Sequence, residues 1–340
     1  MRGLRLGSSY TMDLLNFLSV LTGQEFYVRE HRAAFEVWHP RLSAGSKTAL
    51  GEALALLKSP MLGPALTLGI SAVPNFDDVP LPDLLADPER VRRHLQQTPY
   101  YDPEQWPVGR RVYECVLPVV SELETLGFRR YWEDERRPLI EAAIRRLMAA
   151  IDPLDFDLAR AVAEMLGPPH QSVQPVTVLL CSFVAPHGIK VCGPVYLMDI
   201  REHHPNMVRT ALHEMFHPPY REEEVADALA ALSADPLVRS SFEAQDPVYR
   251  YEPITGWIEE NVVEAMAQYF ADEAGFAGDP VACWHIDRDG QLSAVLLAHM
   301  RRMPKPPTER FADYFHRLVS AMPVGHLDHE YAALRGPAAG

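Results

Sequence analysis

Hydrophobic and polar residues alternate along most of this chain with the spacing of α-helices. Apolar side chains recur three and four positions apart in residues 46–57, 112–125 and 137–151. Pro118 falls inside the second of these segments and can bend or divide that helix. In the second half of the chain the same spacing predicts helices over residues 222–232, 255–272, 291–302 and 308–320.

A different pattern occupies the middle of the chain. Residues 176–184 are apolar and rich in β-branched side chains, and residues 189–200 form a second extended run. The residues between them are typical of a turn, so we expect the two runs to pair as antiparallel strands. The predicted fold is therefore α+β and predominantly helical, with a small antiparallel sheet. We expect a mostly helical N-terminal region, residues 1–165, and a second domain, residues 166–340.

The composition and net charge of the chain argue against some classes of binding partner. The chain has 340 residues, of which 47% are hydrophobic and 23% charged, as in an ordinary globular protein. Its net charge of −14 argues against binding to nucleic acids or anionic membranes, which attract basic surfaces. No apolar run is long enough to span a bilayer. The apolar stretch at residues 14–21 is short and lacks a cleavage site, so we expect a cytoplasmic protein.

The cysteines favour the same compartment. None of the four belongs to a Cys-x-x-Cys pair, which argues against a structural zinc ribbon. Four cysteines in a chain of this length are also too few for a disulfide framework. We therefore expect free thiols at Cys115, Cys181, Cys192 and Cys283.

The most informative motif is His213-Glu214-Met215-Phe216-His217. Two histidines four residues apart lie one above the other on a helix, because a turn contains 3.6 residues. They can supply two of the three protein ligands of a catalytic zinc ion. Glu214 is turned away from the metal but can accept a proton from a water at its open position. Pro205 suits the first turn of this helix, and Pro218-Pro219 ends it.

A third zinc ligand has to come from elsewhere. A histidine six residues after His217 would be one solution, but that position holds Glu223. The predicted helix at residues 255–272 offers Glu260 and Glu264, which are four residues apart and share one face. From helix geometry alone, either carboxylate could reach the metal.

This order of motifs resembles the gluzincin metallopeptidases, the group of thermolysin-like and aminopeptidase-like enzymes. The resemblance covers residues 176–272: a strand, an HExxH helix and a later glutamate-bearing helix. Residues 264–269, Glu-Ala-Met-Ala-Gln-Tyr, are similar to the segment that the ligand glutamate opens in that group. The resemblance implies a zincin-like catalytic domain that binds Zn²⁺ through His213, His217 and Glu264. Val263 and Gln268 depart from it, since the group has Asn and Asp there.

The mechanism expected from this site is hydrolysis of a peptide substrate, with Glu214 as general base. A further side chain should stabilise the oxyanion. The candidates for that role are Tyr220, Tyr249, Tyr251, His285, His326 and His329. The strand at residues 193–199 is expected at a sheet edge, where a peptide could add as a further strand.

Two other functions remain open from the sequence. The same site could hydrolyse a non-peptide amide or ester, because chemistry at a carbonyl does not define the rest of the substrate. The chain could also be a metallopeptidase-like scaffold that binds or regulates without catalysis. Gln268 slightly favours the scaffold, whereas Glu214 argues against it, because a binding protein needs no general base.

Overall fold

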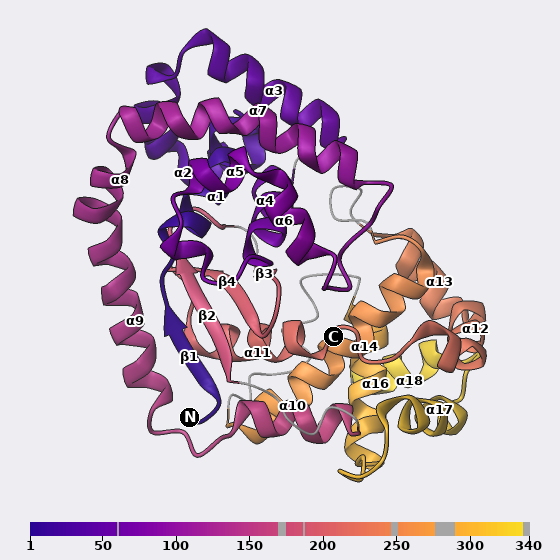
Figure 1. Ribbon diagram of the computed structural model, residues 1–340. Coiled ribbons are helices and arrows are strands. Elements are labelled where there is room, and N and C mark those ends of the chain that lie inside the picture. The colour runs from indigo at the N-terminus through magenta and orange to yellow at the C-terminus, as the bar shows by residue number, and fades with distance from the viewer. Residues whose placement is uncertain (60, 169–174, 186–187, 246–250, 276–289, 336–340) are drawn as a thin grey trace, which may run out of the picture. The chain divides into compact units, whose positions relative to one another are not determined.

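The computed structural model describes all residues except 60, 169–174, 186–187, 246–250, 276–289 and 336–340 (Figure 1). The described part is mostly helical, with one small mixed four-stranded sheet. The chain divides into two compact units. We call residues 5–151 with 176–203 the N-terminal unit, and residues 1–4, 152–175 and 204–340 the C-terminal unit.

This division differs from the expected boundary between residues 165 and 166. The segment that carries the strands groups with the N-terminal helices because its end is tied to them. The carboxylate of Asp13 accepts hydrogen bonds from the backbone N–H groups of Ser182 and Phe183, at 2.8 and 3.0 Å. The ring of Phe183 also contacts Phe17, with centroids 4.5 Å apart.

The helices of the N-terminal unit are built around α1, which is buried along its whole length. They are α1 (Tyr10–Leu21), α2 (Glu25–Trp38), α3 (Ala44–Leu57), α4 (Leu62–Ser71), α5 (Leu81–Ala86), α6 (Pro88–Leu95), α7 (Trp106–Thr125), α8 (Phe128–Tyr131) and α9 (Arg137–Ile151). Gly63 lets α4 approach α1 closely, because a Cβ there would lie 2.8 Å from the hydroxyl of Ser19. In Figure 1, α3 and α7 run side by side.

The sheet has the order β1-β2-β4-β3, with β1 (Leu4–Gly7), β2 (Val176–Cys181), β3 (Ile189–Lys190) and β4 (Val195–Asp199). The expectation of one antiparallel pair was wrong, because β2 and β4 pair in parallel. The second extended run breaks near Gly193, which has a positive φ of 76°. Its first part, β3, pairs antiparallel with β4. β4 is therefore an interior strand, and the expected edge at residues 193–199 was also wrong.

The predicted helices of the N-terminal unit are confirmed. The segment 137–151 coincides with α9, and 46–57 lies within α3, whose first turn is capped by the hydroxyl of Ser43. The segment 112–125 lies within α7, which continues through Pro118 as one helix.

The described part of the C-terminal unit is helical apart from its connections and Leu4, the first residue of β1. Its elements are α10 (Leu158–Leu166), α11 (His204–Phe216), a short 3₁₀ turn (Glu222–Glu224), α12 (Ala226–Ala234), α13 (Pro236–Glu243), α14 (Ile254–Glu273), α16 (Gln291–Arg302), α17 (Phe311–Ala321) and α18 (Leu327–Leu334). The helices expected at 255–272, 291–302 and 308–320 correspond to α14, α16 and α17. The helix expected at 222–232 begins later, as α12.

The long helix α14 is the centre of this unit and packs against α11, α12 and α16. Asn261 joins α14 to α16, because its side-chain oxygen accepts hydrogen bonds from the N–H and the hydroxyl of Ser293, at 3.2 and 2.7 Å. Its side-chain amide donates to the carbonyl of Trp257. Since these groups are buried, the joint fixes how α14 is rotated about its axis.

Two further expectations concern the chain as a whole. Cys115, Cys181 and Cys192 are free thiols, and Cys283 lies outside the described residues. Among the described residues, no single helix is long and apolar enough to cross a membrane, although the bent pair α3 and α4 together passes that test.

Candidate metal centre

Two histidines at the end of α11 supply the nitrogen atoms of the site. His213 lies in the last turn of the helix and His217 directly follows its last residue. Their Nε2 atoms are 3.2 Å apart. The opposite side of α11 is apolar and fully buried at Met207, Val208, Ala211 and Leu212. That burial turns the two imidazoles toward α14, against which α11 packs.

Glu260 of α14 completes a group of three possible ligands. Its two carboxylate oxygens lie 3.3 Å from Nε2 of His213 and 3.6 Å from Nε2 of His217. One atom from each residue lies within 4.8 Å of the other two, a spacing at which all three could bind one metal ion. Two imidazole nitrogens and one carboxylate oxygen are a donor set that suits zinc and leaves a fourth position open.

Two more carboxylates of α14 contact the outer nitrogens of the same rings. Glu264 lies 3.1 Å from Nδ1 of His213, and Glu259 lies 3.0 Å from Nδ1 of His217. A carboxylate at Nδ1 holds the proton on that nitrogen and leaves Nε2 able to bind a metal. Each histidine therefore has its own orienting partner.

The glutamate on the outer side of His213 has a cationic partner as well. The guanidinium of Arg209 donates to Glu264 at 2.7 Å. Arg209 lies one turn before His213 on α11, so both contact Glu264 from the same helix. This contact holds one oxygen of Glu264 away from the position where the Nε2 atoms converge.

Glu264 does not lie where a zinc ligand is expected, because it contacts Nδ1 of His213 and not the region between the two Nε2 atoms. His213 and His217 come together as the spacing predicts. The carboxylate that meets both Nε2 atoms belongs to Glu260, one turn earlier on α14. The similarity of residues 264–269 to a gluzincin segment had favoured Glu264, the second of the two glutamates on this face of α14. The helical spacing of the pair offers both glutamates and does not distinguish between them.

The electrostatics of the cluster are dominated by negative charge. Burial disfavours the charged imidazole of His213, but the hydrogen bonds that its ring donates to the carboxylates of Glu260 and Glu264 outweigh this and raise its pKa to about 10. Burial also opposes ionisation of Glu260, yet its contacts with His213 and His217 lower its pKa to about 2. The three carboxylates thus favour the protonated, positively charged form of the two imidazoles, and the same field would attract a metal cation.

A comparison with protein-family models, curated proteins and solved structures finds no match. The functional interpretation of the cluster therefore depends on its own geometry and on the side chains around it.

Glu214, the expected general base, adjoins His213 and is half-buried. Tyr251 lies near it. Burial raises the pKa of the Tyr251 phenol, and the carboxylates of Glu260 and Glu214 raise it further. Tyr251 as a whole is 46% exposed, so burial covers only part of the residue.

The other expected oxyanion-stabilising residues are placed less favourably. The hydroxyl of Tyr220 has no hydrogen-bond partner among the described residues, but it is buried, so a ligand cannot contact it in its present position. His326 precedes α18 and His329 lies in its first turn, and the two rings stack on each other. Tyr249 and His285 lie outside the described residues.

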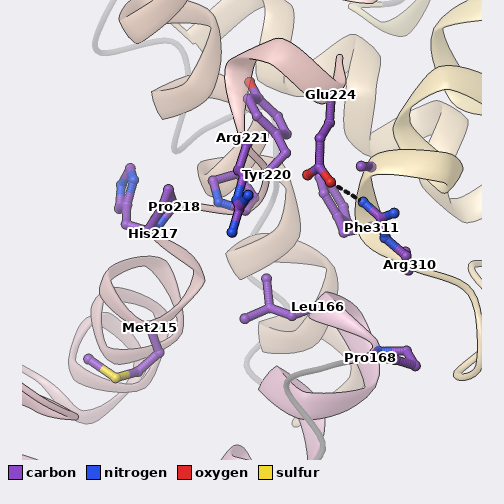
Figure 2. Close-up of a pocket in the computed structure, with 12 residues that line it drawn as sticks. Leu166, Pro168, Met215, His217, Pro218, Tyr220, Arg221, Glu224, Arg310 and Phe311 are labelled. Atoms are coloured by element: carbon purple, nitrogen blue, oxygen red, sulfur yellow. Dashed lines mark hydrogen bonds and ion pairs between the residues drawn. The ribbon is translucent and has the colours of Figure 1, made fainter. Parts of the chain in front are cut away.

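A cavity of about 730 Å³ opens beside His217 (Figure 2). Its lining combines buried apolar side chains with three charged ones: Leu166, Pro168, Met215, His217, Pro218, Pro219, Tyr220, Arg221, Glu224, Arg310, Phe311 and Ala312. Volumes of roughly 300–1,000 Å³ are usual for ligand pockets. His217 belongs both to this cavity and to the three-residue cluster, so a molecule in the cavity would lie next to the candidate metal position.

Proposed function

We propose that the protein is a zinc-dependent hydrolase that cleaves peptide bonds, with a zincin-like catalytic core in its C-terminal unit. The observation that supports this most directly is the convergence of His213, His217 and Glu260. Glu214 follows the first of these ligands in the chain, where a general base is needed. All four residues belong to the C-terminal unit.

The ligand set of this proposal differs from the one that the gluzincin resemblance implies. Glu260 would bind zinc with the two histidines, and Glu264 would orient His213 through Nδ1. The proposal keeps the general plan of an HExxH helix and a later glutamate-bearing helix. It also gives both histidines a carboxylate partner, an arrangement that raises the basicity of a metal-binding imidazole.

Zinc bound by these residues would polarise the substrate carbonyl and lower the pKa of a water in the open position to about 7. Glu214 would take the proton of the attacking water and pass it to the leaving amine. The phenol of Tyr251 could donate a hydrogen bond to the carbonyl oxygen as negative charge develops there. Glu259 and Glu264 would keep the two imidazole rings in place during these steps.

A peptide is favoured over a small amide by the cavity that shares His217 with the cluster. Its size suits a side chain or a terminal residue next to the bond that is cut. A scaffold without catalytic activity is disfavoured by the presence of Glu214 beside the ligands.

Metal content and turnover test the proposal together. Purified protein should contain about one zinc per chain by mass spectrometry of its metals, and it should cleave members of a peptide library. Glu214→Gln should retain zinc and lose hydrolysis by a factor on the order of 100 or more, because only proton transfer is removed. His217→Ala should lose both.

The matched control is Glu223→Gln, which removes an exposed carboxylate of the same unit and should change neither property. Wild-type protein that binds no zinc after incubation with excess metal would overturn the proposal. So would zinc-loaded protein in which Glu214→Gln leaves turnover unchanged.

A further inference from the structure

The cavity beside His217 contains a positive charge that the proposed hydrolysis does not use. Two guanidinium groups and one carboxylate line it, those of Arg221, Arg310 and Glu224. Arg310 forms an ion pair with Glu224. No carboxylate among the described residues pairs with Arg221, so the lining keeps one uncompensated positive charge. Figure 2 shows Arg221 between His217 and the Arg310–Glu224 pair.

Apart from His217, the rest of the lining is apolar. Tyr220 and Phe311 stack with nearly parallel rings, 6.3 Å between centroids, and both are largely buried. Leu166 and Met215 are each only 8% exposed. A cavity with an apolar wall and one cationic side chain that no carboxylate neutralises suits a ligand that is apolar on one side and carries a single negative charge.

We infer that this cavity binds a substrate residue that carries a carboxylate, with Arg221 holding that carboxylate and the apolar wall contacting the remainder. The inference rests on the proposed function, because it assigns the substrate class of the same site. A guanidinium is the side chain best suited to this role, since it can donate two parallel hydrogen bonds to one carboxylate.

The carboxylate can have two sources with the same chemistry. One is the free C-terminus of a peptide, which would make the enzyme a carboxypeptidase. The other is the side chain of an aspartate or glutamate beside the bond that is cut. In both cases Arg221 contributes mainly to the affinity for substrate, and the chemistry at the carbonyl stays with the metal cluster and Glu214.

Binding of matched peptides tests the inference without requiring turnover. The probes are an N-acyl-Gly-Phe peptide with a free C-terminus, the same peptide as its C-terminal amide, and a pair of amides extended by Glu or by Gln. Affinity is measured by calorimetry on zinc-loaded Glu214→Gln protein and on metal-free wild-type protein. We expect at least one carboxylate probe to bind about ten- to a hundredfold more tightly than its uncharged counterpart.

Substitutions identify the residue that makes this preference. Arg221→Gln should abolish it, and Arg221→Lys should restore part of it because the charge remains. Arg239→Gln is the matched control, since Arg239 is an exposed arginine on α13 that does not line the cavity. It should leave the preference unchanged. Thermal unfolding of each variant confirms that it is folded.

The outcomes separate this inference from the proposed function. A preference for the free C-terminus or for the Glu side chain supports the inference and identifies the source of the carboxylate. Equal binding of charged and uncharged probes overturns it, as does a preference that survives in Arg221→Gln. If the metal-free protein shows an Arg221-dependent preference for a carboxylate but the protein never binds zinc, the inference about the cavity is supported and the hydrolase proposal fails.

Discussion

Glu264 lies 3.1 Å from Nδ1 of His213, on the side of the imidazole opposite the Nε2 atom that faces His217. A single glutamate cannot both orient the ring from that side and bind a metal at Nε2. The two carboxylates that share a face of α14 therefore have different roles. Glu260 lies at Nε2 of His213, where a metal ion would bind, and Glu264 lies at Nδ1, on the outer side of the ring.

This division predicts unequal effects on zinc affinity. Glu260→Gln should weaken zinc binding by more than about 100-fold, because it replaces a ligand, whereas Glu264→Gln should weaken it by about 10- to 100-fold. Competition with a chromophoric chelator measures both. A greater loss in Glu264→Gln than in Glu260→Gln would falsify the assignment and restore the ligand set implied by the gluzincin resemblance.

Zinc should stabilise the folded chain, because the three ligands converge only when α11 and α14 are packed together. At a free zinc concentration 100 times the dissociation constant, the free energy of unfolding should rise by about 2.7 kcal/mol. Thermal unfolding with added zinc and with EDTA checks this. His213→Ala protein should unfold at the same temperature under both conditions, and a zinc-dependent increase in that variant would argue against this site.

The buried hydroxyl of Tyr220 should contribute little to stability. It has no hydrogen-bond partner among the described residues, so Tyr220→Phe should change the free energy of unfolding by less than about 0.5 kcal/mol or raise it. Tyr220→Ala should cost about 3–5 kcal/mol, because the ring stacks on Phe311 and Phe315. Urea unfolding separates the two effects. A loss above about 1.5 kcal/mol in Tyr220→Phe would mean that the hydroxyl is bonded.

Asp13 should make the stability of the N-terminal unit depend on pH. Burial raises its pKa to about 7, although hydrogen bonds from Trp132 and from the backbone of Phe183 and Ser182, together with the nearby Arg136, act in the opposite direction. Since a raised pKa means that the folded state binds the proton more tightly, stability should fall as pH rises from about 4 to about 7.

Urea unfolding of the wild type and of Asp13→Asn across that range tests this effect. The variant should lack this component of the pH dependence. It should also be less stable throughout, because an amide can replace only one of the two acceptor oxygens that Trp132, Ser182 and Phe183 contact. Parallel pH profiles for the two proteins would show that Asp13 does not titrate in this range.

Helices could be predicted from the sequence because their evidence is local. The apolar spacing in residues 137–151 and 291–302 corresponds to α9 and α16, and the prolines around the HExxH motif mark both ends of α11. The strands were recognised as extended runs, but their direction was not, because pairing depends on a break at Gly193 and on long-range contacts.

The candidate site, too, could be predicted from the sequence only in part. The spacing of His213 and His217 is a property of one helix, so their convergence could be predicted from the sequence. The choice between Glu260 and Glu264 depends on how far α14 slides and rotates against α11, which no local pattern contains. The contact between Arg209 and Glu264 was missed for the same reason, as was Glu259 beside His217.

The buried amide of Asn261 adjoins Glu260 in the chain and is anchored to Ser293 on α16. Every carboxylate of the cluster is carried by α14, so a small turn of that helix would move all of them at once. Metal binding at the proposed site would therefore depend on how α14 is aligned with its neighbours α11 and α16. A substitution that weakens the hydrogen bond between Asn261 and Ser293, and leaves every proposed ligand in place, should therefore speed the release of the metal.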